Sequence, residues 1–382
     1  MLKNPTWDIF CTVVDNFGDI GVSFRLARQL AAEHEVAVRL WVDDLASLQQ
    51  LCPELDPEQE VQFQHGVEVR HWAQNFPDVL PGDVVIAAFA CDLPENYLAA
   101  MAARTVKPIW INLEYLSAET WVQGCHGLPS PHPRLPLLKY FFFPGFAPGT
   151  GGVLMERGLS ERRHAFQQDP KAQAAFWQSL GVPAQVQEEF TVSLFCYENK
   201  AVRGLLTAWA DEKFPVVCLI PEGRILGEVC AFFGEAVLHP GSVHRSGNLT
   251  AHILPFMAQD CYDKLLWACH LNFVRGEDSF VHAQWAATPL VWHIYPQQDA
   301  AHWKKLTAFM DIYCADLPQA AAASLRALWE NWNREGSAGQ SWAELWQHWP
   351  ILQEHACRWA DGLLAQGDLA SNLMHFCKNK LQ

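Results

Sequence analysis

Short apolar runs alternate with helical patterns along most of this 382-residue chain, and this alternation constrains its fold more than any other feature. Residues 8–14 and 36–42 are apolar with little polar alternation, which is typical of strands buried on both faces of a sheet. Between them, residues 22–34 carry the apolar stripe of a helix. Further strands are expected at residues 67–72, 84–90, 106–111 and 140–143. Repeated strand–helix–strand units predict a parallel sheet covered by helices.

A second strand–helix series follows the turn-rich stretch PGFAPGTGG at residues 144–152 and a helix expected at residues 161–180. Its expected strands are residues 190–197, 215–220, 250–256, 271–274 and 290–294, and its expected helices lie near residues 201–210, 260–269, 279–286 and 302–310. Two successive doubly wound, Rossmann-like units that face a central cleft are the GT-B layout of glycosyltransferases. We therefore predict an α/β fold of this type.

The length of the chain exceeds the usual limit for a single core, which also favours two domains. We predict an N-terminal acceptor-side domain over residues 1–165 and a C-terminal nucleotide-sugar-binding domain over residues 185–350, with the boundary within residues 150–188. Terminal helices are expected at residues 320–332 and 341–377, the second bent at Pro350. The last helix, from about residue 355 to 382, is expected to cross back to the first domain.

Composition excludes several classes of function. A net charge of −15 argues against a nucleic-acid-binding protein, which would show a basic patch. No apolar run has membrane-spanning length and residues 1–7 lack the pattern of a secretion signal, so we expect a cytoplasmic protein without a membrane partner. Twelve scattered cysteines without a Cys-x-x-Cys pair favour buried, reduced thiols over a disulfide or zinc framework.

The turn Asp15-Asn16-Phe17-Gly18-Asp19 lies between the first expected strand and the first expected helix. Such turns place backbone N–H groups at the positive end of a helix, where anions bind. Two carboxylates would repel a phosphate here, so they suit an acid–base pair or acceptors for a cationic or hydroxylic substrate. The alternative is that both are ordinary turn and cap residues. Asn112, Glu114 and Tyr115 follow a later strand and belong at the same sheet edge.

The second series contains a matching turn, Arg275-Gly276-Glu277-Asp278-Ser279, between a strand and a helix. Arg275 can pair with a diphosphate, and N–H groups near Ser279 point the same way. Glu277 and Asp278 suit ribose or sugar hydroxyls, although a capped helix start with a surface ion pair is the alternative.

Aromatic and amide side chains at other strand ends suit a nucleobase. Phe195 and Tyr197 lie on one face of their strand, and Phe256 and Gln259 follow another. Phe195 could equally be a core residue. Histidines such as His293 and His302 could line the cleft but are more often structural. The chain has no Walker loop, no Gly-x-Ser-x-Gly and no complete dinucleotide turn, which makes a dehydrogenase a weak alternative.

Several motifs resemble one bacterial family over essentially the full length of the chain. They are DNFGDIGVSFRLARQL, FACDLPENY, INLEYLSAE, FVRGEDSFVHAQWA and PLVWHIYPQQDAAHWKKL. The family is the protein-arginine rhamnosyltransferases that modify elongation factor P, the EarP family. One departure is His282, where the family pattern leads us to expect Arg.

The resemblance implies an inverting enzyme that moves L-rhamnose from dTDP-β-L-rhamnose to an arginine of elongation factor P, which then helps ribosomes through polyproline stretches. It makes Asp15 and Asp19 the essential pair. The chemistry of a guanidinium acceptor then makes Asp19 the expected general base and Asp15 the residue that orients the acceptor, and we expect Glu277 to be a further catalytic residue. No cofactor or metal is expected, because Arg275 and a helix N-terminus can stabilise the leaving dTDP. The donor-binding residues carried over by motif are Phe195, Tyr197, Phe256, Gln259, Arg275, Glu277, Asp278 and Ser279. We also expect Phe17, Gly18 and Asn112 to bind the donor.

Two rival functions remain open from the sequence. One is a GT-B glycosyltransferase with a small-molecule or lipid acceptor. The other is a non-catalytic module that binds a translation factor without binding a nucleotide sugar.

Overall fold

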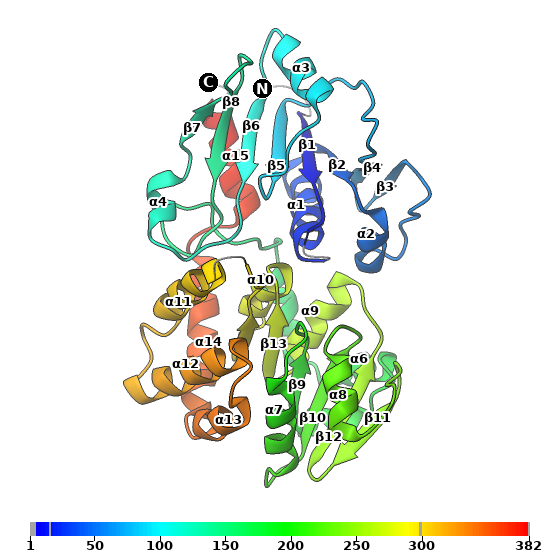
Figure 1. Ribbon diagram of the computed structural model, residues 1–382, viewed down its shortest axis with the longest axis vertical. Helices are drawn as coiled ribbons and strands as arrows, with labels where there is room; N and C mark the ends of the chain where they lie inside the picture. The colour runs from blue at the N-terminus through cyan, green and yellow to red at the C-terminus, as the bar shows by residue number, and fades with distance from the viewer. Residues whose placement is uncertain (1–4, 15–16, 298–299, 381–382) are drawn as a thin grey trace. The chain divides into compact units, whose positions relative to one another are not determined.

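The structure is a computed structural model that describes residues 5–14, 17–297 and 300–380. The chain forms two compact units (Figure 1). Unit 1 comprises Met1–Arg157 and Leu363–Gln382, and unit 2 comprises Gly158–Gly362. The chain therefore passes from one unit to the other twice, once after Arg157 and once after Gly362. The expected helices at residues 161–180 belong to unit 2.

Unit 1 is built on an eight-stranded sheet with the order β3-β4-β2-β1-β5-β6-β8-β7. All neighbours pair in parallel except the two edge strands, β3 and β7, which pair antiparallel. The central strands β1 and β5 are almost entirely buried, as their apolar sequences predict. The strands are β1 (Thr6–Cys11), β2 (Ala37–Val42), β3 (Val61–Gln64), β4 (Val67–His71), β5 (Val84–Ala88), β6 (Ile109–Leu113), β7 (Pro129–Pro131) and β8 (Leu138–Phe142).

The helices of unit 1 include one from the far end of the chain. They are α1 (Gly18–His34), α2 (Leu45–Leu51), α3 (Glu95–Ala103), α4 (Trp121–Cys125) and α15 (Leu369–Lys380). Helix α15 packs against α1. The amide of Gln29 on α1 joins the two by donating to Met155 O at 2.7 Å and to Asp368 Oδ1 at 3.0 Å. The C-terminal helix is therefore an integral part of unit 1.

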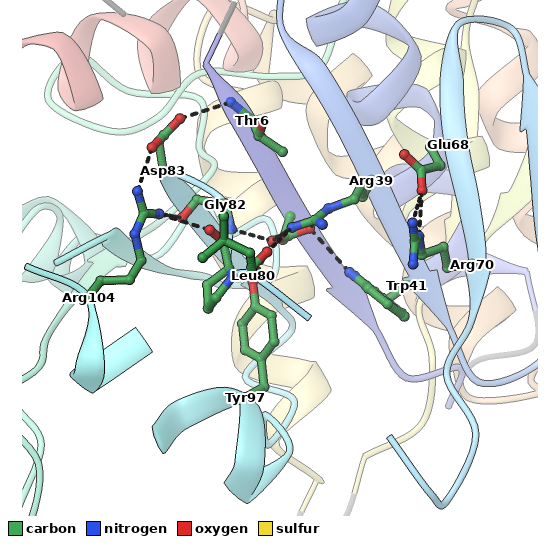
Figure 2. Close-up of polar contacts among 12 residues, drawn as sticks. Thr6, Arg39, Trp41, Glu68, Arg70, Leu80, Gly82, Asp83, Tyr97 and Arg104 are labelled. Carbon is green, nitrogen blue, oxygen red and sulfur yellow. Dashed lines mark hydrogen bonds and ion pairs between the residues drawn. The ribbon is translucent and has the colours of Figure 1, made fainter. Parts of the chain in front are cut away.

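A completely buried carboxylate, Asp8, holds the amino end of β1 to its surroundings. Arg39 on β2 pairs with both of its oxygens at 2.6 Å. Trp41 Nε1 and the Gly82 amide also donate to it, at 3.2 and 2.7 Å, and so does the Tyr97 hydroxyl of α3. Figure 2 shows these donors converging from a strand, a loop and a helix. Every oxygen of the buried charge is thus hydrogen-bonded, as burial in a protein core requires.

Unit 2 is built on a six-stranded sheet with the order β11-β12-β10-β9-β13-β14. Only the edge strand β11 pairs antiparallel. Its strands are β9 (Phe190–Leu194), β10 (Val216–Pro221), β11 (Val243–Ser246), β12 (Leu249–Leu254), β13 (Leu271–Arg275) and β14 (Leu290–His293). Two parallel, helix-covered sheets in one chain are the α/β architecture that the sequence predicts.

The helices of unit 2 surround this sheet. They are α5 (Leu159–Gln167), α6 (Pro170–Ser179), the 3₁₀ turn η1 (Ala184–Glu188), α7 (Ala201–Ala210), α8 (Leu226–Phe233), α9 (Gln259–Ala268), α10 (Asp278–Trp285), α11 (Ala301–Tyr313), α12 (Gln319–Asn333), α13 (Ala338–Trp346) and α14 (Trp349–Leu364). No helix in the described parts of the chain is both long enough and apolar enough to cross a membrane.

Two predictions about helices are wrong. The expected helix at residues 161–180 is two helices, because Asp169 caps α6 and Pro170 opens it. The expected single helix at residues 341–377 is three. Pro350 lies in the first turn of α14, where proline is tolerated, so it starts a helix and does not bend one. The edge strands β3, β7 and β11 were not expected at all.

Candidate active site

The first candidate turn joins β1 to α1 at the carboxyl edge of the sheet in unit 1. Asp15 and Asn16 lie outside the described residues. Helix α1 begins at Gly18, four residues before the predicted start at Val22, so Asp19 belongs to its first turn. The Asp19 side chain is only 2% exposed, and its Oδ2 accepts the backbone N–H of Val14 at 2.9 Å. The positive end of a helix stabilises a carboxylate at this position.

A carboxylate that was not considered from the sequence also supports this turn. Asp43 follows β2 directly, and its Oδ1 accepts the backbone N–H of Val13 at 2.9 Å. Asp43 and Asp19 therefore each accept one backbone N–H from the residues that lead into the turn. The signal was present in the sequence, because Asp43 lies at the end of a strand next to β1 in a parallel sheet.

Asn112 and its neighbours lie at the same edge, two strands away from β1. Asn112 is buried at the end of β6, and its amide donates to the Glu114 carboxylate. The Glu114 N–H donates to Phe142 O at 2.9 Å, and Tyr115 stacks on Phe89 with ring centroids 4.5 Å apart. Phe17 and Gly18 begin α1 at this edge. The unit 1 candidates thus share one sheet edge, while their roles stay predictions.

The second candidate turn joins β13 to α10 in unit 2. Arg275 ends the strand, and Gly276 turns the chain with φ 60°, a left-handed conformation that favours glycine. Ser279 locks the turn: its Oγ accepts the Arg275 N–H at 3.1 Å and donates to Arg275 O. Trp292 Nε1 donates to Gly276 O at 2.7 Å. The strand, tight turn and helix predicted from the sequence are present.

The guanidinium of Arg275 lies over two aromatic side chains. Its central carbon lies 4.4 Å from the ring centroid of Phe195 and 4.9 Å from that of Tyr197. The side chain of Arg275 is only 7% exposed. Cation–π contacts of this kind fix the orientation of a guanidinium. The two aromatic residues follow β9, which ends at Leu194 and not at residue 197 as predicted.

The remaining candidates of unit 2 surround the same turn. Gln259 opens α9, and its amide donates to Asp278 Oδ2 at 3.2 Å. Phe256 lies edge-on to Phe195, with centroids 6.4 Å apart. Glu277 directly precedes α10 and makes no capping bond with its side chain. The structure therefore gathers Phe195, Tyr197, Phe256, Gln259, Arg275, Glu277, Asp278 and Ser279 around one strand end.

Two further buried side chains, His293 and Tyr262, contact the aromatic residues of this group. The His293 ring lies 5.2 Å from Tyr197, and burial, followed by the charge of Arg275, lowers the pKa of His293 to about 3. The His293 ring is therefore uncharged at neutral pH and packs against Tyr197. The Tyr262 ring lies 5.5 Å from Phe195, and burial raises the pKa of Tyr262 well above its ordinary value. Tyr262 is not predictable as a site residue, because its spacing on its helix gives only a core signal.

The unusual His282 lies further along α10. Its Nδ1 pairs with Asp263 Oδ1 on α9 at 3.0 Å, and both side chains are almost fully buried. This pair ties α9 to α10.

Comparison with known families decides what kind of chain this is. The family described as "Elongation-Factor P (EF-P) rhamnosyltransferase EarP" matches residues 7–378. The chain belongs to the EarP family. It is accordingly an enzyme, a glycosyltransferase that transfers rhamnose, and the prediction of a GT-B fold is confirmed.

Relatives and solved structures agree with this membership. A protein-arginine rhamnosyltransferase of Pseudomonas putida is 53% identical over 376 residues, which cover 98% of this chain and 99% of the relative. One from Neisseria meningitidis is 37% identical over 362 residues, covering 93% and 90%. A structure that describes EarP-mediated arginine glycosylation of translation elongation factor EF-P is 38% identical, with a TM-score of 0.72 and coverage of 98% and 99%. A spinosyn rhamnosyltransferase, 11% identical with a TM-score of 0.51 and coverage of 97% and 99%, shares the fold.

Proposed function

We propose that this enzyme transfers L-rhamnose from dTDP-β-L-rhamnose to an arginine side chain of elongation factor P, which the modification activates for polyproline translation. The acceptor is supported by relatives named protein-arginine rhamnosyltransferases and by the similar structure that concerns arginine glycosylation of EF-P. The observation that carries the donor half is the buried Arg275, whose guanidinium contacts the rings of Phe195 and Tyr197 close to the start of α10.

The Arg275 turn is suited to a nucleoside diphosphate. A guanidinium pairs with phosphate oxygens through two parallel hydrogen bonds, and a helix N-terminus adds N–H donors. The Asp278 carboxylate can accept hydrogen bonds from sugar hydroxyls. The Gln259 side-chain amide, which donates to Asp278, can also donate to and accept from the edge of a base. When the C1–O bond breaks, negative charge develops on the departing dTDP, and Arg275 would stabilise it without a metal.

The acceptor requires a base. A guanidinium is cationic and its nitrogen lone pairs are delocalised, so it is a weak nucleophile at neutral pH. As one guanidinium nitrogen bonds to C1 from the side opposite the leaving group, it loses a proton. Asp19 is our choice for the proton acceptor, and Asp15 for the group that orients the guanidinium, with Glu277 as a further catalytic residue. Attack from the opposite side inverts the configuration at C1.

Intact-mass analysis of elongation factor P tests this function. With the enzyme and dTDP-β-L-rhamnose, the factor should gain one deoxyhexose, and fragmentation should place the deoxyhexose on arginine. Asp19→Asn keeps an oxygen acceptor for the Val14 amide, yet removes the base. It should slow transfer by about 10²-fold or more. Donor hydrolysis without gain of mass by the factor would instead favour a small-molecule or lipid acceptor. Full transfer by Asp19→Asn would reject the base assignment.

A further inference from the structure

Three potential metal ligands meet in unit 1, in the segment that runs from α2 through the β3–β4 hairpin. They are the Cys52 thiol, the Glu54 carboxylate and the His65 imidazole, with one ligand atom of each lying within 4.8 Å of the other two. Among the described residues, no other cluster of three or more His, Cys, Asp or Glu side chains meets this criterion. None of the three takes part in the transfer chemistry proposed above.

We propose that Cys52, Glu54 and His65 form a zinc site, with water as the fourth ligand. Thiolate, carboxylate and imidazole are the three ligand types that zinc uses, and three protein ligands leave one tetrahedral position open. Ligand atoms around a tetrahedral zinc ion lie roughly 3.3–3.7 Å apart, as the Zn–ligand distances imply. Cys52 Sγ and Glu54 Oε2 are already 3.5 Å apart.

Each of the three ligand residues is positioned by a different contact. Cys52 ends α2, where its N–H donates to Leu48 O at 2.9 Å. The Gln64 amide of β3 donates to Glu54 O at 3.0 Å and thereby ties the Glu54 turn to the hairpin. His65 occupies the hairpin turn with φ 50°, and its ring lies edge-on to Phe24 with centroids 6.0 Å apart. Cys52 is buried, whereas Glu54 and His65 are exposed.

Zinc binding requires the Cys52 thiol to lose its proton. Burial, and then the neighbouring Glu54 carboxylate, raise the pKa of Cys52 to about 11, so the thiol carries a proton at neutral pH. A zinc ion replaces that proton: the S–H bond breaks, the S–Zn bond forms and H⁺ leaves to solvent.

Cobalt(II) is the probe, because a thiolate bound to it gives a near-ultraviolet charge-transfer band. The full chain, freed of metal and kept reduced, should bind one equivalent with this band, and zinc(II) should abolish it. Cys52→Ser should remove the band. Cys125→Ser, at a half-buried thiol of α4 outside the cluster, should keep it. The absence of a band in the unmodified protein, or its survival in Cys52→Ser, would overturn the proposal.

A second variant separates lost ligation from lost folding. His65→Asn keeps a residue that tolerates the left-handed backbone of the turn. It removes the imidazole and should weaken cobalt binding at least 10-fold with an unchanged circular dichroism spectrum. Equal affinity in His65→Asn would contradict the assignment of His65 as a ligand.

Discussion

Asp8 shows how a single buried charge can set the geometry of unit 1. Its oxygens receive hydrogen bonds from Arg39, Trp41, Gly82 and Tyr97. Burial, together with the nearby Asp8 charge, raises the pKa of the Tyr97 hydroxyl well above its ordinary value, so the phenol stays protonated and donates. The network fixes the amino end of β1, and the same strand delivers the Asp19 turn at its other end.

Asp8→Asn should therefore destabilise unit 1 strongly. The amide leaves the Arg39 guanidinium without its bidentate anion, and breaking a buried ion pair from one side costs about 3–5 kcal/mol. Urea unfolding followed by circular dichroism measures the loss. The matched control is Glu68→Gln, which removes the partly exposed ion pair with Arg70 (Figure 2) and should cost about 1 kcal/mol or less. Equal costs for the two variants would contradict the role given to Asp8.

Residue-scale prediction from the sequence succeeds where a side chain lies at the end of a predictable strand. Arg275 and Ser279 are examples, because a strand, a glycine turn and a helix N-terminus leave little choice of geometry. The partners of Asp8 could not be predicted, since they lie 31 to 89 positions away along the chain. Tyr262 was missed for a similar reason: nothing local distinguishes it from a core aromatic.

At the scale of elements, most of the parallel strands were predictable because they are short, mainly apolar runs; β4 (VEVRH) instead alternates apolar and polar residues. The edge strands β3, β7 and β11 are three or four residues long and contain exposed positions, so they leave no such signal. The division of residues 341–377 into three helices depends on two breaks: one at residues 347–348, and a turn after α14 in which Gly367 has φ 76°. Helical periodicity alone continues across that turn.

The crossing of α7 and α13 in unit 2 gives a sharp test at this scale. A Cβ atom added to Gly339 would lie 2.2 Å from Gly204 O, and because that oxygen belongs to the backbone the helices must separate. Gly339→Ala should cost about 1–3 kcal/mol. In Gly204→Ala the new Cβ would lie 3.8 Å from its nearest neighbour, so this variant should be stabilised by up to about 1 kcal/mol through helix propensity. Thermal unfolding of both variants checks the sign; stabilisation by Gly339→Ala would contradict the close crossing.

At the scale of the whole molecule, each sheet presents one strand–turn–helix site at its carboxyl edge. The turn in unit 1 carries Asp19, and the turn in unit 2 carries Arg275. Under the proposed function, the general base Asp19 lies in unit 1 and the diphosphate-binding Arg275 lies in unit 2, while the donor-binding candidates Phe17, Gly18 and Asn112 belong to unit 1. The sequence predicts the placement of the two turns because both follow recognisable strands, while the cleft expected between the units stays a prediction.

Calorimetric titration of dTDP into the unmodified enzyme, Asp19→Asn and Arg275→Ala tests most directly whether Arg275, and not Asp19, binds the donor. The account predicts that Asp19→Asn binds dTDP as tightly as the unmodified enzyme. Arg275→Ala should bind it roughly 10- to 100-fold more weakly, because it loses charge-assisted hydrogen bonds to the diphosphate. Equal dTDP affinity in Arg275→Ala, or a large loss of affinity confined to Asp19→Asn, would contradict the account.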